Sequence, residues 1–150
     1  MIRDDIKAAL VTAMKARDAE TTNAIRLIQA AVKNRDIELR GNANPPEDNV
    51  LVSEVLQKMV KQRRESIEMY DKGGRAELAD AERAEVAVIE RFLPQMMSEA
   101  ETVVAIESIK AEIGASGVKD MGRVMAELKA RHAGTLDMSK ASGLVKAALA

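Results

Sequence analysis

The chain has 150 residues, of which 47% are apolar and 31% charged, with one Phe, one Tyr and no Trp. An apolar share made up of Ala, Val, Leu, Ile and Met is typical of helical bundles, and a chain of this length can bury a core of its own. The 23 basic and 24 acidic residues nearly cancel, so any nucleic-acid footprint must be local, and the lack of cysteine excludes disulfides, thiolate nucleophiles and cysteine-based zinc sites.

Two helical patterns precede the first clear loop. In the first, apolar residues recur with helical spacing, and the predicted core stripe is Ile2, Ile6, Leu10, Ala13 and Met14. The second begins near Thr21, and its stripe is Ile25, Ile28, Val32 and Leu39. It ends in RGNANPPED, because Gly41 favours a helix stop and the prolines cannot continue a helix.

A third and a fourth helix are predicted on either side of a double glycine. The third follows Pro46 and is broken at Gly73 and Gly74. Its apolar stripe is Val52, Leu56, Val60, Ile67 and Tyr70. The fourth runs from about Arg75 to Leu93, and Pro94 ends it.

Three shorter helices complete the chain. Ser98 and Glu101 form a capping box for the fifth, whose apolar positions are Val103, Ile106, Ile109 and Ile113. The sixth follows the turn at Gly114 and Gly117, and Asp137 is placed as the N-cap of the seventh. The predicted fold is all-α, with an N-terminal four-helix bundle at residues 1–94 and a small three-helix tail domain at residues 95–150.

The cellular location follows from what the N-terminus lacks. The stretch MIRDDIKAALVTAMKARDAE alternates apolar and charged residues, unlike a signal peptide, and no apolar run approaches the roughly 20 residues of a membrane span. Because a chain without cysteine also suits a reducing compartment, we expect a soluble cytoplasmic protein with no membrane partner.

Stretches along essentially the whole chain carry a family resemblance. They are AMKARD from Ala13, IRLIQAAVKN from Ile25, LQKMVKQRRESIEMYDKGGRAELADAE from Leu56, FLPQMMSEAE from Phe92, KDMGRVMAELK from Lys119 and the closing LVKAAL. They resemble the YqeY-like family, and the run from Lys58 to Glu82 is the most specific. The C-terminal part is also similar to the tail domain of the B subunit of the bacterial glutamyl/aspartyl-tRNA amidotransferase (GatB/YqeY).

The resemblance implies a helical domain joined to a three-helix tail, and in the amidotransferase the corresponding tail meets tRNA. It also brings the family label of carbon-nitrogen ligase with glutamine as amido donor. That chemistry requires an activated nucleophile and a nucleotide-binding loop, yet the chain has one histidine, His132, no cysteine, and neither a G-x-S-x-G nor a G-x-x-x-x-G-K-[ST] motif. The residues therefore favour a protein with no catalytic site, cofactor or metal of its own.

Charged residues fall on two apolar stripes. Arg63 lies on the stripe of the third helix, where an unpaired charge is costly, and Glu82 and Glu85 lie on that of the fourth. Two carboxylates can hold a metal or act in acid–base catalysis, but a metal site in a bundle needs further ligands that no other stripe supplies. We predict a structural ion pair between Arg63 and Glu82 or Glu85.

The neighbouring cations of the third helix have glutamates four residues away. This spacing predicts helical surface pairs for Lys58 with Glu54, Lys61 with Glu65 and Arg64 with Glu68. Most of the charge in this basic run is then neutralised locally.

The end of the chain is polarised in charge. From Gly114 to Ala150 six basic residues stand against three acidic ones, a net +3, whereas from Gln95 to Ile113 one stands against four, a net −3. A polarised surface can orient a phosphate backbone, and without an aromatic residue the tail is not expected to stack on bases. The candidate RNA-binding residues are Lys119, Arg123, Lys140 and Lys146.

Two features of this tail have more than one interpretation. The cations also fit an ordinary solvated helix face. Gly122, within the sixth helix, leaves room either for a neighbouring helix or for an RNA backbone.

Three functions of different classes remain. The first is a non-catalytic module that binds tRNA or another structured RNA, with no DNA partner expected. The second is a protein-interaction adaptor, because Met side chains adapt to varied apolar partners and several cluster in the tail, namely Met96, Met97, Met121 and Met125. The third is an accessory role in glutamine-dependent amidation, which rests on the family resemblance alone.

Overall fold

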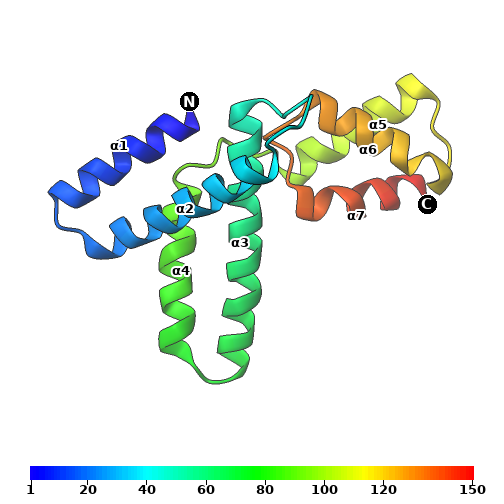
Figure 1. Cartoon of the computed structure of the whole chain (residues 1–150). Coiled ribbons are helices and arrows are strands. Elements are labelled where there is room, and N and C mark those ends of the chain that lie inside the picture. The colour runs from blue at the N-terminus through cyan, green and yellow to red at the C-terminus, as the bar shows by residue number, and fades with distance from the viewer. The chain divides into compact units, whose positions relative to one another are not determined.

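The computed structural model describes residues 1–150 and contains seven α-helices and one short 3-10 helix, η1 (Figure 1). The predicted all-α fold is confirmed. The chain divides into two compact units, Met1–Leu93 and Pro94–Ala150, and each has its own apolar core. None of the helices is both long enough and apolar enough to cross a membrane.

The first unit opens with an antiparallel helical hairpin, α1 (Ile2–Lys15) and α2 (Ala19–Glu38) (Figure 1). Asp18 begins α2 by accepting a hydrogen bond of 3.0 Å from the backbone N–H of Thr21, which satisfies one of the free donors at the helix start. The inner face of α2 buries Ala24, Ile25, Ile28 and Val32. Its opposite face is therefore left to solvent.

A second hairpin, α3 (Asp48–Lys72) and α4 (Ala76–Glu90), makes the most extensive helix–helix contact in the chain. The fully buried residues of α3 end at Met59, and they pack with α1 and α2 into one core. Beyond Met59 the two helices run on together away from α1 and α2 as far as the turn at Gly73 and Gly74 (Figure 1). This distal half has no buried residue on α3, whereas α4 contributes the buried Ala79 and Val86.

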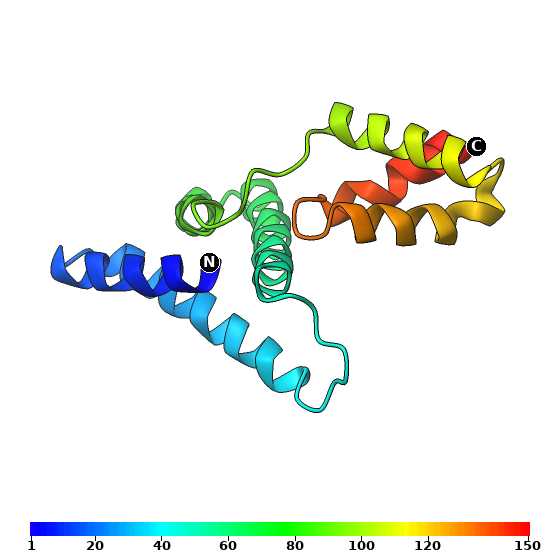
Figure 2. The same cartoon turned by 90° about the horizontal axis from the view of Figure 1, so that it is seen from above.

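The second unit is a bundle of α5 (Glu99–Ile113), α6 (Met121–Arg131) and α7 (Met138–Leu149), in which each helix contacts the other two (Figure 2). η1 (Val118–Asp120) leads into α6. The predicted capping box of Ser98 and Glu101 is present, and Asp137 caps α7. The core is built from Ile106, Ile109, Val124, Leu128, Leu136, Val145 and Leu149.

Three local predictions of burial or helix end differ from the structure. Met14, expected on the core stripe of the first helix, is exposed, because α1 buries only Ile6 and Ala13. Val103, expected in the core, is exposed, because α5 turns only the stripe of Thr102, Ile106 and Ile109 inward. The fourth helix ends at Glu90 rather than near Leu93, and the residues up to Pro94 form a turn.

Candidate nucleic-acid interface

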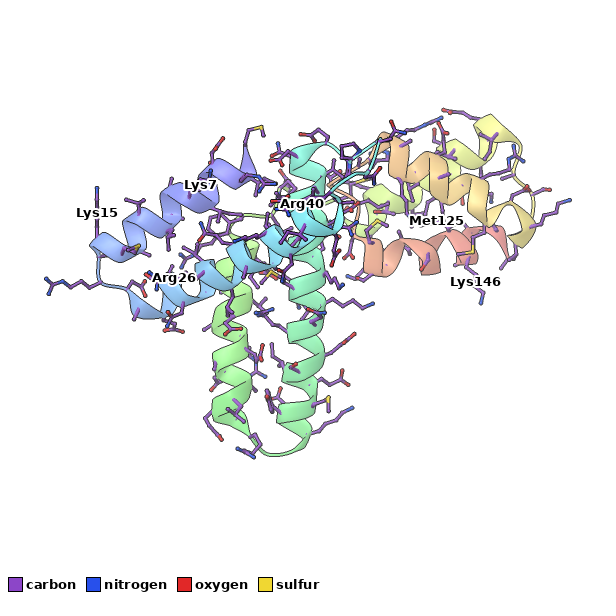
Figure 3. All side chains as sticks on the ribbon, in the orientation of Figure 1. Lys7, Lys15, Arg26, Arg40, Met125 and Lys146 are labelled. Atoms are coloured by element: carbon purple, nitrogen blue, oxygen red, sulfur yellow. The ribbon has the colours of Figure 1, made fainter.

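The four predicted RNA-binding residues lie on three elements of the second unit. Lys119 is on η1, Arg123 is in the first half of α6, and Lys140 and Lys146 are on α7. All four side chains are exposed. Figure 3 labels Lys146 on α7 and Met125 on α6.

Arg123 forms hydrogen bonds that stabilise the loop between α5 and α6. Its Nη1 donates to Asp120 Oδ1 at 3.2 Å, and its Nη2 donates at 3.1 Å to the carbonyl oxygen of Ile113, in the last turn of α5. The other carboxylate oxygen of Asp120 accepts a 3.1 Å hydrogen bond from the backbone N–H of Ser116. That backbone hydrogen bond, with the Arg123 contact, lowers the pKa of Asp120. Together these groups fix the loop between α5 and α6.

Unlike Arg123, the three predicted lysines are not held by hydrogen bonds. Lys119, Lys140 and Lys146 make no ion pair or hydrogen bond through their ammonium groups. Lys129 on α6 is also exposed and unpaired, although it was not among the predicted residues. Arg131, two residues further along the chain, pairs with Glu112 and Glu127. A count of charges along the sequence does not distinguish such a paired cation from an unpaired one.

The topology groups these four lysines in pairs. α7 returns along α6 after a short loop, and η1 packs against α7 (Figures 1 and 2). Lys129 and Lys140 therefore lie toward the loop between the two helices, and Lys119 and Lys146 lie toward the opposite end. The cations are spread along the α6–α7 pair.

The solvent face of α7 is open between its two lysines. Gly143 lies midway between Lys140 and Lys146 in sequence, and a Cβ atom built on it would meet no atom within 4 Å. The same holds for Gly122 on α6, so close packing of a neighbouring helix does not explain that glycine. α7 contains no acidic residue to neutralise its lysines.

The ion pair predicted for Arg63 lies between α3 and α4. Arg63 Nε donates to Glu85 Oε2 at 2.8 Å and is 4.0 Å from Glu82 Oε2. Its Nη1 also donates to the carbonyl oxygen of Met59 at 3.4 Å. The guanidinium thus lies against both carboxylates and balances negative charge inside the hairpin.

The surface pairs predicted beside it do not form. Arg64 contacts Glu90 of α4 at 2.6 Å instead of Glu68, which pairs with Lys72. Lys58 and Lys61 have no ion pair. α4 offers Arg64 a carboxylate from across the hairpin, a partner that spacing along one helix cannot reveal.

A comparison with family models decides the identity. The model described as Yqey-like protein matches residues 3–149. The chain belongs to the YqeY-like family.

Curated relatives of this YqeY-like protein carry one name, altered inheritance of mitochondria protein 41, mitochondrial. The protein of that name from Eremothecium gossypii is 30% identical over 135 residues, which cover 90% of this chain and 64% of the relative. Its namesake from Lachancea thermotolerans is 29% identical over 111 residues, covering 73% and 58%. That from Meyerozyma guilliermondii is 33% identical over 91 residues, covering 61% and 46%. The chain thus spans between about half and two thirds of the length of these relatives.

These relatives correct the expected location. The sequence predicted a cytoplasmic protein, whereas the relatives of this YqeY-like protein are named as mitochondrial. The prediction used general features, namely the lack of cysteine and of long apolar runs, and these do not distinguish one reducing compartment from another.

Proposed function

We propose that this YqeY-like protein is a non-catalytic RNA-binding module whose second unit contacts the phosphate backbone of a structured RNA. Transfer RNA is the first candidate, because the C-terminal part resembles the tail of the tRNA amidotransferase B subunit. The proposal concerns the 150 residues of this chain and not the longer relatives.

The observation that carries the proposal is the set of unpaired lysines on the second unit. Lys119, Lys129, Lys140 and Lys146 are exposed, and none of their ammonium groups forms an ion pair or a hydrogen bond within the protein. Lys119 has only an electrostatic interaction with Asp120. An exposed ammonium keeps its hydration and can exchange it for a phosphate, and each such contact releases counterions from the nucleic acid. Cations already held in ion pairs, such as Arg131, contribute less to such a surface.

The composition of the second unit supports contact with phosphates rather than with bases. Tyr70 and Phe92 both precede Pro94, so the second unit has no Phe, Tyr or Trp on which an unpaired base could stack. Lysine recognises phosphate as a point charge and does not read base edges bidentately as arginine does. The expected binding is therefore sensitive to salt and tolerant of sequence.

The adaptor hypothesis loses part of its support. Met97, Met121 and Met125, which suggested an adaptable apolar surface, are partly buried against the core of the second unit. Filling gaps in a core is the commoner role of methionine. These three methionines therefore contribute to the core of the second unit.

The test measures affinity for unfractionated tRNA by fluorescence anisotropy over a range of salt concentrations. The variant K119Q/K129Q/K140Q/K146Q keeps Arg123, so the contacts of the α5–α6 loop are retained. If the lysines contact phosphates, affinity falls and the slope of log affinity against log salt becomes shallower by about three to four units. Wild-type affinity and salt slope in the variant would remove the second unit from the binding surface.

A matched control uses an acidic residue of α5 that forms no ion pair. The variant E99Q raises the net charge of the unit by one and leaves every ion pair in place. If binding reflects only the net charge of the unit, this variant should bind RNA more tightly, with little change in the slope of log affinity against log salt. If the four lysines contact phosphates, that slope should change only in the lysine variant.

A further inference from the structure

Exposed cations line one flank of α2 in the first unit and the turn that follows the helix. Arg26 and Lys33 are seven residues apart, which is close to two helical turns, so they lie on the same side of α2, and Arg40 follows two residues after the helix ends at Glu38. All three are exposed, and none forms an ion pair or a side-chain hydrogen bond. At about 1.5 Å per residue, Arg26 and Lys33 are about 10 Å apart along the helix axis. We call Arg26, Lys33 and Arg40 the α2 ridge (Figure 3 labels its two ends).

The α2 ridge borders a hollow at its midpoint. Between α1 and α2 lies a half-open cavity of about 260 Å³, with Lys7 and Lys33 among its lining residues and Ile6 and Val32 contributing apolar surface. Lys7 is exposed and unpaired, as Lys33 is. Gln29, one turn before Lys33, also lines the cavity and offers an amide donor.

The remaining charges of the cavity are already paired. Arg3 donates to Asp36 at 3.0 Å and to Asp48 at 2.8 Å, so its charge and that of Asp36 are committed to holding α1, α2 and α3 together. The pKa of Arg3 is raised by these carboxylates, and that of Asp48 is lowered by Arg3. Lys7 and Lys33 are therefore the cations of the cavity that are free to bind an anion.

The burial of the apolar face of α2 favours a nucleic acid over a membrane surface as the ligand of the α2 ridge. A helix that lies on a bilayer inserts a broad apolar face, but the apolar stripe of α2, including Ile25, Ile28 and Val32, is already buried in the core. Only Leu27 and Ile37 of α2 are exposed large apolar side chains. A row of separated cations instead matches a polyanion that presents a phosphate every few ångströms along its length.

From this arrangement we infer that the α2 ridge and Lys7 form a second surface for the phosphodiester backbone of structured RNA. The backbone runs along α2 across Arg26, Lys33 and Arg40, and one phosphate is held at the hollow between Lys7 and Lys33. This inference takes RNA as the ligand from the proposed function, but it concerns residues of the first unit and stands or fails separately from the lysines of the second.

The experiment compares the wild type with the variant R26Q/K33Q/R40Q, using unfractionated tRNA and an RNA duplex as probes. An exposed unpaired cation contributes little to folding, so the variant is expected to keep the wild-type helical circular dichroism and thermal midpoint. Its affinity for both probes should fall about tenfold or more, with a salt slope shallower by about two to three units. Adding K7Q should weaken binding further.

The matched control is K58Q/K61Q/R91Q. It removes the same number of positive charges from exposed positions on α3 and at the end of α4, none of which forms an ion pair or a side-chain hydrogen bond. Arg91 has only an electrostatic interaction, with Asp18. If general attraction explains binding, the control loses as much affinity as the ridge variant, and the inference is overturned. If the ridge is the contact surface, the control stays near the wild type.

The two proposals fail in different ways. Loss of binding in the K119Q/K129Q/K140Q/K146Q variant with no loss in the ridge variant overturns the second surface and leaves the proposed function standing. The reverse result supports the ridge and removes the second unit from the site. Absence of RNA binding by the wild type overturns both, as does binding only to anionic phosphatidylserine vesicles in a parallel flotation assay.

Discussion

Arg63 on α3 and Glu85 on α4 form a hydrogen-bonded ion pair, with 2.8 Å between Nε and Oε2, in the half of the hairpin that has no fully buried apolar residue on α3. The Arg63 side chain is 16% exposed and that of Glu85 is 33% exposed. The pair is thus shielded on one side and hydrated on the other. It joins the two helices in the half of the hairpin where α3 contributes no buried apolar side chain.

Replacing Arg63 by methionine should lower the free energy of unfolding by about 1–3 kcal/mol. The change leaves Glu82 and Glu85 close together without a cation, and the partial exposure of the site keeps the loss below that of a fully buried pair. Urea denaturation followed by circular dichroism measures it. The control Lys61→Met, at an exposed position without a partner, should change stability by under about 0.5 kcal/mol. Equal midpoints for R63M and K61M would show that the pair contributes nothing.

The loop between α5 and α6 should make stability depend on pH through Asp120. Its pKa is lowered in the folded protein, so its contribution is fully present above the ordinary Asp pKa of about 4 and is lost as pH falls through the lowered value. The variant D120N should therefore melt at a lower temperature than the wild type at pH 7, and the two midpoints should draw closer as the pH falls below the ordinary Asp pKa of about 4. A difference that stays constant down to pH 2.5 would contradict a role for the Asp120 charge.

Two glycines of the second unit should respond to alanine in opposite directions. Gly143 is inside α7, and an added Cβ meets no neighbour, so G143A should stabilise the protein by about 0.5–1 kcal/mol through helix propensity. Gly114 ends α5 in the left-handed region with a φ of 68°, so G114A should destabilise it by about 1 kcal/mol. Thermal unfolding of both variants checks the signs. A shift of the same sign in both would refute the backbone argument.

The purified protein should release no ammonia from glutamine, with or without ATP, above a buffer control. The chain has no cysteine, and its one histidine, His132, is the C-cap of α6, where its backbone N–H donates to the carbonyl of Leu128. No nucleophile, base and oxyanion donor converge there. Coupled detection of ammonia is the measurement. Activity that stays with the protein through successive columns and is lost in H132A would overturn the prediction.

The helices and several of their ends could be predicted from the sequence, because the signals involved act over a few residues, although the end of α4 at Glu90 could not. Ser98 with Glu101 and Asp137 cap the helices that follow them as predicted, and the glycine pair at 73 and 74 separates α3 from α4. Capping and helical periodicity depend on neighbours within about one turn of the chain. The predicted compartment depended on no such local signal, and the mitochondrial names of the relatives contradict it.

Only the tertiary structure decided which charges are free. Spacing along a single helix predicted Glu68 as the partner of Arg64, but Arg64 contacts Glu90 on α4. Arg123, counted as an RNA-binding cation, is held by Asp120 and the end of α5, whereas Lys129 was overlooked and is unpaired. The cavity that joins Lys7 to Lys33 exists only where α1 packs on α2. Helical sequence specifies which side chains share a face, but the partner of a charge is set by the helix that packs against that face, and this depends on contacts between residues far apart in the chain.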